Sequence, residues 1–225
     1  MNRQKILVWD IPLRIFHWLL AISFAGAFLT AESERWRNVH VAFGYTMLGL
    51  IVFRAFWAIA GTRYARFSAF AFGPRRVLSY LRSLITFTPQ HYVGHNPAGS
   101  WAIYALVALT ITAGLTGYMT FNEIGGHWLE DAHEAAANAL LTVVIVHIAG
   151  VVVSSIVHRE NLVRAMLTGY KSGTAGEGIR YRHRAVAAVV LVTVAAFWFG
   201  GTDALTGPNV HTSVATHDAA HEHHR

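Results

Sequence analysis

The amino-acid sequence predicts an all-α membrane protein, in which a transmembrane four-helix bundle is followed by a fifth transmembrane helix. Hydrophobic residues make up 54% of the 225 residues and charged residues only 13%, with a mean hydropathy of +0.38. A soluble globular domain rarely has so few charges, whereas a bundle of membrane helices usually does. The apolar residues are also gathered into long runs that polar or basic segments separate.

The apolar runs give the positions of five predicted spans. The first begins at Pro12, where proline costs no helical hydrogen bond because the first turn of a helix has free N–H groups. Basic residues precede this run, but no small-residue cleavage site follows it, so we expect a retained helix and not a signal peptide. The spans cover residues 12–30, 39–60, 101–121, 133–158 and 185–200.

The segments between the spans divide the chain into three parts. Residues 61–100 contain five arginines and no acidic residue, and residues 74–87 within them can form an amphipathic helix at the membrane interface. We expect residues 1–172 to form the four-helix membrane domain, with 61–100 as its interfacial loop. Residues 173–202 would supply a linker and the fifth helix, and residues 203–225 a flexible, histidine-rich tail.

The distribution of lysine and arginine predicts the orientation of the spans. Fifteen of the 18 Lys and Arg residues lie near the N-terminus, in residues 54–82 or in residues 159–184. Only Arg35, Arg37 and Arg225 fall on the other side of the membrane. Because cytoplasmic loops are enriched in Lys and Arg, we expect a cytoplasmic N-terminus and a C-terminus on the outer side of the membrane. Topology thus accounts for the net charge of +6, and no nucleic-acid partner is expected.

The cysteine and histidine contents restrict the chemistry of the protein. The chain has no cysteine, which excludes disulfides, iron–sulfur ligation, thiolate catalysis and covalent attachment of a c-type haem. Its 14 histidines are therefore the abundant metal-ligating side chains. A metal transporter would need a polar path through the spans, and the apolar runs show none.

Four histidines in the spans can be paired by their depth in the membrane. His133 and His147 are 14 residues apart, so they lie within about 40° on one helix face and about 21 Å apart along its axis. Because successive helices alternate in direction, His40 lies at the depth of His133, and His17 lies at the depth of His147. Imidazoles on opposite sides of a porphyrin hold a low-spin b-type haem, so the pairs predict two haems b.

Each of these histidines also has a simpler interpretation, since a lone histidine in a membrane helix can bond to a neighbouring hydroxyl. Four histidines that pair by depth favour haem ligation, because ionisable residues inside a membrane are commonly functional. Gly44 and Gly150 lie about one turn from His40 and His147 and leave room for a porphyrin face. Small residues serve ordinary helix packing equally well.

Two arginines are candidates for binding the propionate groups of the haem near the cytoplasmic side. Arg54 follows His40 by 14 residues, so it shares the same helix face at the depth of His17 and His147. Arg14 precedes His17 by three residues and is the second candidate. The alternative is that both side chains simply extend toward the membrane interface.

The remaining histidines give weaker indications. His158, Arg159 and Glu160, at the cytoplasmic end of the fourth span, are candidates for binding a quinone head group, and a polar helix end is the alternative. We expect His91 and His95 to have structural roles in their loop. The tail histidines could bind divalent metal outside the cell, although a flexible tail is the simpler interpretation; they are His211, His217, His221, His223 and His224.

Several motifs around the paired histidines carry a resemblance to known proteins. They are FHW in the first span, HVAFGY at the start of the second, HE followed by 12 residues and H in the fourth, and HRENLVRAM after it. These motifs resemble the bacterial cytochrome b561 and nickel–iron hydrogenase b-type cytochrome family. GTRYARFSAF and GHNPAGSW are similar to a branch of that family often described simply as cytochrome b.

The resemblance covers residues 6–172 and has implications for the cofactor and the activity. It implies that His17, His40, His133 and His147 ligate two haems b. It also implies electron transfer between membrane quinone and a periplasmic partner. The fifth span and the tail lie outside the resemblance.

We therefore expect a transmembrane electron conduit between the quinone pool, ubiquinone or menaquinone, and a periplasmic partner such as a c-type cytochrome. One alternative is a superoxide oxidase that passes electrons to quinone, with Arg35 and Arg37 near His40 attracting the anion. Another is a haem b membrane-anchor subunit that relays electrons for a bound dehydrogenase or hydrogenase. The protein is thus either a quinol-dependent oxidoreductase, a superoxide oxidase or an electron carrier.

Overall fold

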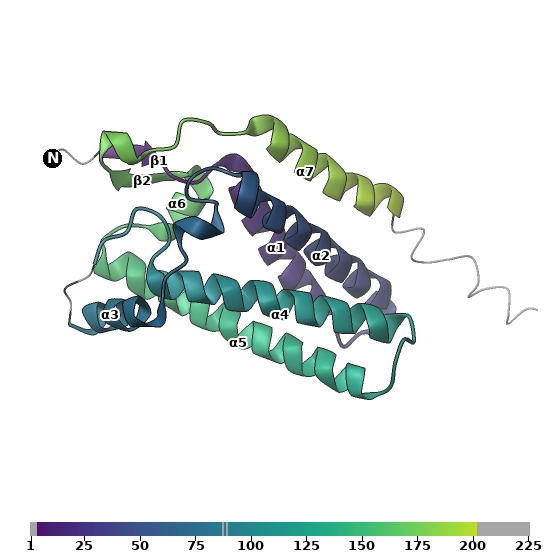
Figure 1. Ribbon diagram of the computed structural model, residues 1–225. Helices are drawn as coiled ribbons and strands as arrows, with labels where there is room; N and C mark the ends of the chain where they lie inside the picture. Colours follow the sequence, from purple (N-terminus) through teal and green to yellow (C-terminus); the bar gives the residue numbers. More distant parts are fainter. Residues whose placement is uncertain (1–3, 87, 89, 202–225) are drawn as a thin grey trace, which may run out of the picture.

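Four long apolar helices lie side by side in the computed structural model, which describes residues 4–86, 88 and 90–201 (Figure 1). Within these residues, each of the four is long and apolar enough to cross a membrane, which confirms the expected helical membrane bundle. They are α1 (Ile11–Thr30), α2 (Arg37–Ala60), α4 (Pro97–Phe121) and α5 (Trp128–Val157). The predicted tail of residues 203–225 and its histidines lie outside the described residues.

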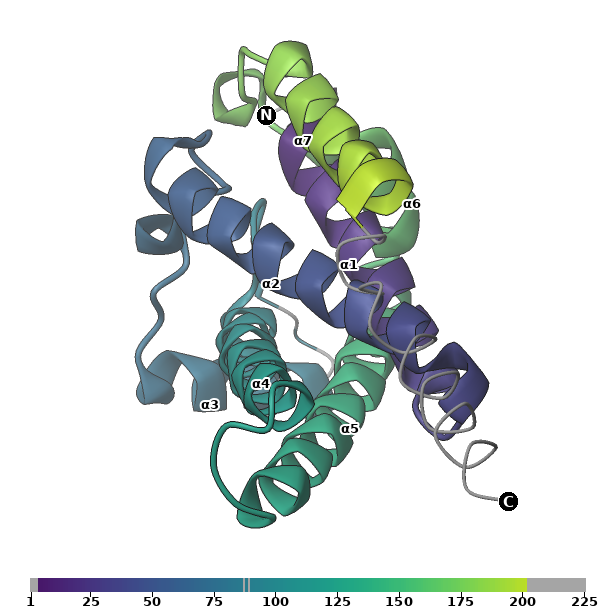
Figure 2. The ribbon, with the colours of Figure 1, turned by 90° about the vertical axis from the view of Figure 1, so that its right-hand side faces the viewer.

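The four helices form two hairpins. α1 packs along α2 and α4 packs along α5, and contacts between α2 and α4 join the two pairs. Figure 2 shows the four helices obliquely, with the α1–α2 pair beside the α4–α5 pair. We call the end of the bundle where α1 turns into α2 and α4 turns into α5 the hairpin end.

A small antiparallel sheet lies at the opposite end, which we call the strand end (Figure 1). Its two strands are β1 (Gln4–Leu7) and β2 (Tyr170–Gly173), with Gln4 opposite Gly173 and Leu7 opposite Tyr170. Since β1 precedes α1 and β2 follows α5, their pairing requires both helices to have these termini at the same end. The sheet is thus consistent with the helix directions that alternation predicts.

Shorter elements complete the strand end. α3 (Pro74–Ile85) corresponds to the predicted interfacial helix, and α6 (Leu162–Thr168) connects α5 to β2. α6 begins where the Asn161 side chain accepts from the Arg164 N–H, and it ends at Gly169, whose φ of 88° favours glycine. Single 3₁₀ turns occupy Glu34–Trp36, Phe67–Ala69 and Ala175–Glu177.

All four long helices begin earlier than the hydropathy predicts, and the difference is largest for α4 and α5. α4 starts at Pro97 because the side chain of Asn96 accepts a hydrogen bond of 2.7 Å from the Gly99 N–H. α5 starts at Trp128, and its first turn contains acidic residues that favour the N-terminus of a helix. The polar links between the spans are therefore shorter than expected.

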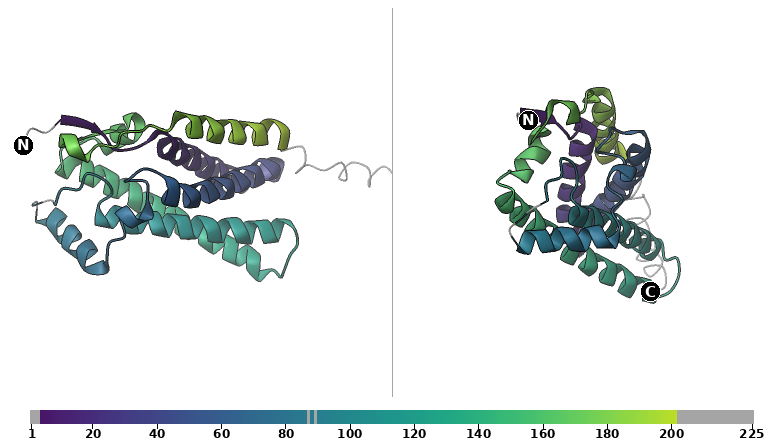
Figure 3. Two further views of the ribbon diagram at one scale, coloured as in Figure 1. Left: turned by 45° about the horizontal axis from the view of Figure 1, so that its top comes forward. Right: turned by 60° about the vertical axis from the view of Figure 1, so that its left-hand side comes forward.

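The predicted fifth helix lies against the outside of the bundle. α7 (Arg184–Ala196) continues into a π-helical turn, Phe197–Gly201, and packs along α1 (Figure 3). The Trp198 ring lies 4.7 Å from the Phe43 ring, and its indole N–H donates to the Thr46 hydroxyl over 3.1 Å. α7 is apolar but shorter than the four membrane-spanning helices.

Asp10 ties together three parts of the strand end. Its fully buried carboxylate caps α1 by accepting from the Leu13 N–H over 2.9 Å. It also accepts from the Trp57 indole N–H over 3.1 Å and from the Thr62 hydroxyl over 2.6 Å. Asp10 therefore fixes the start of α1 against the end of α2. The sequence analysis overlooked it, although an Asp before Ile-Pro is a recognisable helix start.

We predict that Asp10→Ala lowers the stability of the folded protein. The change removes a helix cap and leaves the buried donors of Trp57 and Thr62 without an acceptor, at a cost of about 2–4 kcal/mol. Thermal unfolding in detergent measures this as a lower apparent Tm. The matched control is Asp131→Ala, which removes an exposed carboxylate from α5. Equal unfolding temperatures for the two variants would contradict the proposed role of Asp10.

Candidate functional site

The structure brings His40 and His133 together near the hairpin end. His40 lies in the first turn of α2, and His133 lies in the second turn of α5. Their ring centres are 6.1 Å apart, and the ring planes are almost perpendicular at 85°. The two helices belong to different hairpins, so the pair bridges the two halves of the bundle.

Each of these rings is held by a hydrogen bond to the backbone of a third or fourth helix. His40 Nδ1 lies 2.8 Å from the Ala27 carbonyl oxygen of α1, and His133 Nδ1 lies 2.8 Å from the Ala113 carbonyl oxygen of α4. A carbonyl oxygen can only accept, so both Nδ1 atoms must carry the proton. In a neutral imidazole this leaves the lone pair on Nε2, which is the form that ligates a metal.

A cavity of about 380 Å³ surrounds this pair. Its lining is mainly apolar and comes from α1, α2, α4 and α5. Gly44 lies on its wall, and a Cβ added at Gly44 would meet no atom within 4 Å. Gly117 has the opposite role, because a Cβ there would lie 2.8 Å from Cε1 of His133. Gly117 thus leaves the space that the His133 ring occupies.

The geometry of this pair fits a haem. Two imidazoles bound to one metal from opposite sides, each through a nitrogen about 2 Å away, have ring centres about 6 Å apart. Among the described residues, no group of three or more His, Cys, Asp or Glu side chains could hold a metal ion. A pair of histidines suits a metal that receives its other ligands from a macrocycle, and the apolar cavity suits the macrocycle itself.

The second predicted pair, His17 and His147, lies closer to the strand end. His17 is in the second turn of α1, and His147 lies two thirds of the way along α5. Both side chains are partly buried, and they are close enough to interact electrostatically. Nδ1 of His17 is buried and has no hydrogen-bond partner among the described residues. A buried, unpaired imidazole nitrogen is unfavourable unless a ligand occupies the space beside it.

Arg54 is buried at the same depth. Its side chain is only 2% exposed, and Nη1 has no hydrogen-bond partner among the described residues. The guanidinium lies 4.5 Å from the centre of the Phe67 ring and 6.0 Å from that of Phe70. A buried cation needs an anion to offset its lost hydration, so Arg54 is well placed to receive a carboxylate of a bound group.

Arg14, the other predicted propionate ligand, has different contacts. Its Nε donates to the Met166 carbonyl over 3.3 Å, and its Nη2 donates to the Leu167 carbonyl. These carbonyls lie in the last turn of α6, where the helix leaves its acceptors unsatisfied. Arg14 therefore joins the start of α1 to the end of α6.

The three predicted quinone ligands lie together where α5 ends. Both ring nitrogens of His158 face carbonyl oxygens, Nδ1 that of Ser154 over 2.9 Å and Nε2 that of Gln90 over 3.2 Å. Glu160 accepts from the Ser172 N–H over 2.8 Å. The third residue, Arg159, is exposed to solvent. The contacts of His158 and Glu160 attach the end of α5 to the loop after α3 and to β2.

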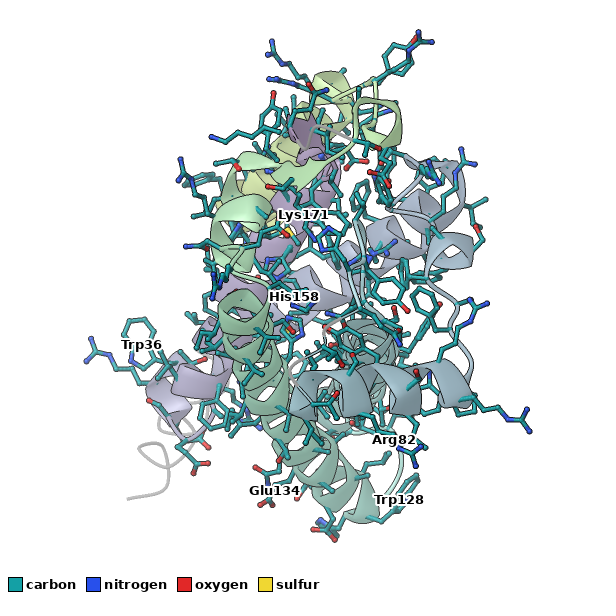
Figure 4. The ribbon with its side chains drawn as sticks, turned by 90° about the vertical axis from the view of Figure 1, so that its left-hand side faces the viewer. Trp36, Arg82, Trp128, Glu134, His158 and Lys171 are labelled. Carbon is teal, nitrogen blue, oxygen red and sulfur yellow. The ribbon has the colours of Figure 1, made fainter. Side chains whose placement is uncertain are left out.

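Lys171 is a buried charged residue that the sequence analysis did not identify. It is 7% exposed, and its ammonium lies 3.5 Å from the Glu160 carboxylate and donates to the Tyr92 carbonyl over 3.3 Å. Burial lowers the pKa of Lys171, and the charge of Glu160 opposes that change. Figure 4 shows Lys171 and His158 at the strand end, with Trp36, Glu134 and Trp128 toward the periphery of the view. No sequence pattern marks a lone lysine in a four-residue strand as buried.

The fold and the paired histidines define a helical membrane protein with a site suited to haem, and comparison with known proteins identifies the family. Residues 8–169 match the family described as Prokaryotic cytochrome b561, and the chain belongs to this family. No solved structure matches the chain. Family membership establishes haem b as the cofactor and electron transfer in a membrane as the role.

Three relatives carry the name "Probable Ni/Fe-hydrogenase B-type cytochrome subunit". The protein from Rhizobium leguminosarum bv. viciae is 23% identical over 214 residues, which cover 75% of this chain and 90% of the relative. The Rhodobacter capsulatus protein is 23% identical over 217 residues, covering 76% and 83%. The Azotobacter vinelandii protein is 26% identical over 218 residues, covering 76% and 90%.

We predict that Gly117→Ala lowers the haem b content per chain. The added methyl group would clash with the His133 ring and move its Nε2 away from the position that the Ala113 carbonyl now fixes. The measurement is haem quantitation on purified protein in detergent. Gly49→Ala is the control, because a Cβ at Gly49 meets no atom within 4 Å and the residue is exposed. Normal haem content in Gly117→Ala would contradict the prediction.

Proposed function

We propose that the chain holds two haems b, one between His40 and His133 and one between His17 and His147. We call the space between the first pair the outer site and the space between the second pair the inner site. When bound, haem b supplies reversible one-electron chemistry. The residues of the chain ligate it, exclude water and tune its potential. The observation that carries the proposal is the 6.1 Å spacing of His40 and His133, with both Nδ1 atoms on helix carbonyls.

The proposed orientation follows from the charges of the two ends. Arg63, Arg66, Arg75, Arg76 and Arg82 all lie in the segment that connects α2 to α4 at the strand end. By the positive-inside rule, the strand end faces the cytoplasm and the hairpin end faces the periplasm of a bacterial inner membrane. The outer site then lies close to the periplasm and the inner site close to the cytoplasm. The two sites form a conduit across most of the bilayer.

We propose that this conduit connects a redox partner at the hairpin end with membrane quinone near the strand end, in the neighbourhood of His158. The names of the relatives favour a hydrogenase as the partner, so the chain would act as the membrane subunit of such a complex. A c-type cytochrome is the second candidate, since it would dock at the same end. Ubiquinone and menaquinone are both suitable acceptors or donors.

A superoxide oxidase has less support from the structure. Its proposed anion attractors, Arg35 and Arg37, are exposed, and Arg37 lies 3.8 Å from the Glu34 carboxylate. The outer cavity is also lined by Glu32 and Glu134, which would repel an anion. Superoxide consumption by the purified chain, followed as quinone reduction, would support this alternative over the partner subunit.

We predict that His40→Ala and His133→Ala each reduce the haem content from two to one per chain. Each variant removes one axial ligand of the outer site and leaves the inner pair intact. Haem quantitation and a reduced-minus-oxidised absorption spectrum measure the change. His127→Ala is the matched control, since the His127 side chain is fully exposed at the start of α5. Loss of both haems in properly folded variants, or wild-type protein with fewer than two, would contradict the pairing.

We predict that Arg54→Leu lowers the midpoint potential of one haem and leaves the other unchanged. A buried positive charge favours the reduced haem, which carries one more electron, so removing the charge makes reduction harder. Redox titration followed by absorption separates the two haems. Arg54→Lys should retain most of the potential, and Arg82→Leu, which removes an exposed arginine of α3 (Figure 4), should have no effect. An unchanged titration of Arg54→Leu would remove Arg54 from the inner site.

A further inference from the structure

His95 lies in the loop before α4 and is packed between two aromatic rings. Its ring centre is 4.6 Å from that of Trp9 and 4.4 Å from that of Phe70. Nδ1 is buried and has no hydrogen-bond partner among the described residues. The next residue, Asn96, caps α4, so the backbone at this position is fixed. Its aromatic contacts suit the structural role that the sequence suggests, but that role does not account for a buried nitrogen without a partner.

Positively charged and titratable groups face His95 from four elements of the fold. They are His17 of α1, Arg54 of α2, His147 of α5 and Lys171 of β2. Burial is the main cause that lowers the pKa of His95, and the charge of Arg54 is the second. Lys171 has Glu160 as its anion, whereas Nη1 of Arg54 has no partner among the described residues. Asp10 acts on Arg54, but the charged groups that act on His95 itself all oppose its protonation.

His95 lines a cavity of about 420 Å³ that opens to the surface at the strand end. Its wall includes His95, together with the titratable side chains of Arg63, His91 and Glu177. Hydrogen bonds from the Thr174 N–H and hydroxyl lower the pKa of Glu177, so its carboxylate is ionised near neutral pH. His95 thus borders a surface cavity and also interacts with the groups of the inner site.

We propose that His95 is the proton-accepting residue of the inner site: it takes up a proton from the strand-end cavity when the inner haem is reduced and returns it on oxidation. The inference rests on the proposed function, since it needs a haem between His17 and His147. A bound inner haem would receive the electron from the redox partner, and His95 would take the proton from solvent that reaches it through the cavity. No other bond forms or breaks.

The charges around His95 explain why this residue would take up a proton when the inner haem is reduced. The carboxylates of a haem beside Arg54 would offset the positive charge of Arg54, which now opposes protonation of His95. Reduction adds one further negative charge within the same poorly solvated region, where charges interact much more strongly than in water. Both changes raise the affinity of His95 for a proton. The cavity gives the proton a route from solvent that does not cross the membrane.

The test is a redox titration of the wild-type protein at several pH values between about 5 and 8, where an imidazole can titrate. We expect the midpoint potential of one haem to fall as the pH rises. The slope should approach the value for one proton taken up with each electron. In His95→Phe this dependence should disappear while both haems are retained. His127→Phe is the matched control, because it removes a fully exposed imidazole at the hairpin end, and it should keep the wild-type dependence.

The outcomes separate this inference from the proposed function. Fewer than two haems in the wild type would reject the proposed function itself. Two haems with pH-independent potentials, or a dependence that persists in His95→Phe, would overturn the role of His95. If His95→Phe fails to bind haem, His95→Gln replaces it, because glutamine is polar but does not titrate. A pH-indicator dye gives a second readout, since the wild type must take up protons on chemical reduction and His95→Gln must not.

Discussion

The hydrogen bonds from Nδ1 of His40 and His133 to helix carbonyls are the interactions on which the outer site depends. An imidazole in the hydrocarbon region must satisfy one nitrogen before the other can serve as a ligand, because no water is available to do so. The acceptors are Ala27 of α1 and Ala113 of α4, so all four helices contribute to one pair of ligands. The tautomer of each histidine therefore depends on how closely the neighbouring helix packs against it. Gly117 matters because its lack of a side chain lets α4 and the His133 ring come close together.

The inner site depends on a different set of contacts. Asp10, Arg14 and the pairing of β1 with β2 fix the start of α1 relative to the ends of α2, α5 and α6. These are the helix ends that carry His17, Arg54 and His147. The strand end thus holds the inner site through polar contacts between connecting segments, whereas the hairpin end holds the outer site through hydrogen bonds between the helices themselves.

Hydropathy and helical periodicity were sufficient to predict the four membrane helices, α3, α7 and the spatial pairing of His40 with His133. These features depend on local composition or on the fixed rise of a helix, both of which a single sequence shows. The sheet was missed because four-residue strands have no clear alternation and pair across more than 160 residues. The burial of Lys171 and the surroundings of His95 could not be predicted for a related reason, since both depend on which distant segments cover these side chains. The haem assignments of the four histidines remain predictions.

Under the proposed ligation, the two sites should differ in potential, and three features act in the same direction. The first feature is hydrogen bonding: the outer ligands donate Nδ1–H to carbonyls, which makes an imidazole a better electron donor and favours oxidised iron. Nδ1 of His17 has no such partner among the described residues.

The other two features are charges near the two sites. Arg54 is buried, and a unit positive charge about 8 Å from an iron would favour its reduced form by about 2 kcal/mol at an effective dielectric constant of 20. Glu32 and Glu134 also favour oxidised iron at the outer site, but they are exposed and their effect is screened. The buried arginine should therefore dominate, so electrons move downhill from the outer to the inner site. That direction suits a partner that delivers electrons at the hairpin end and a quinone that receives them near the strand end.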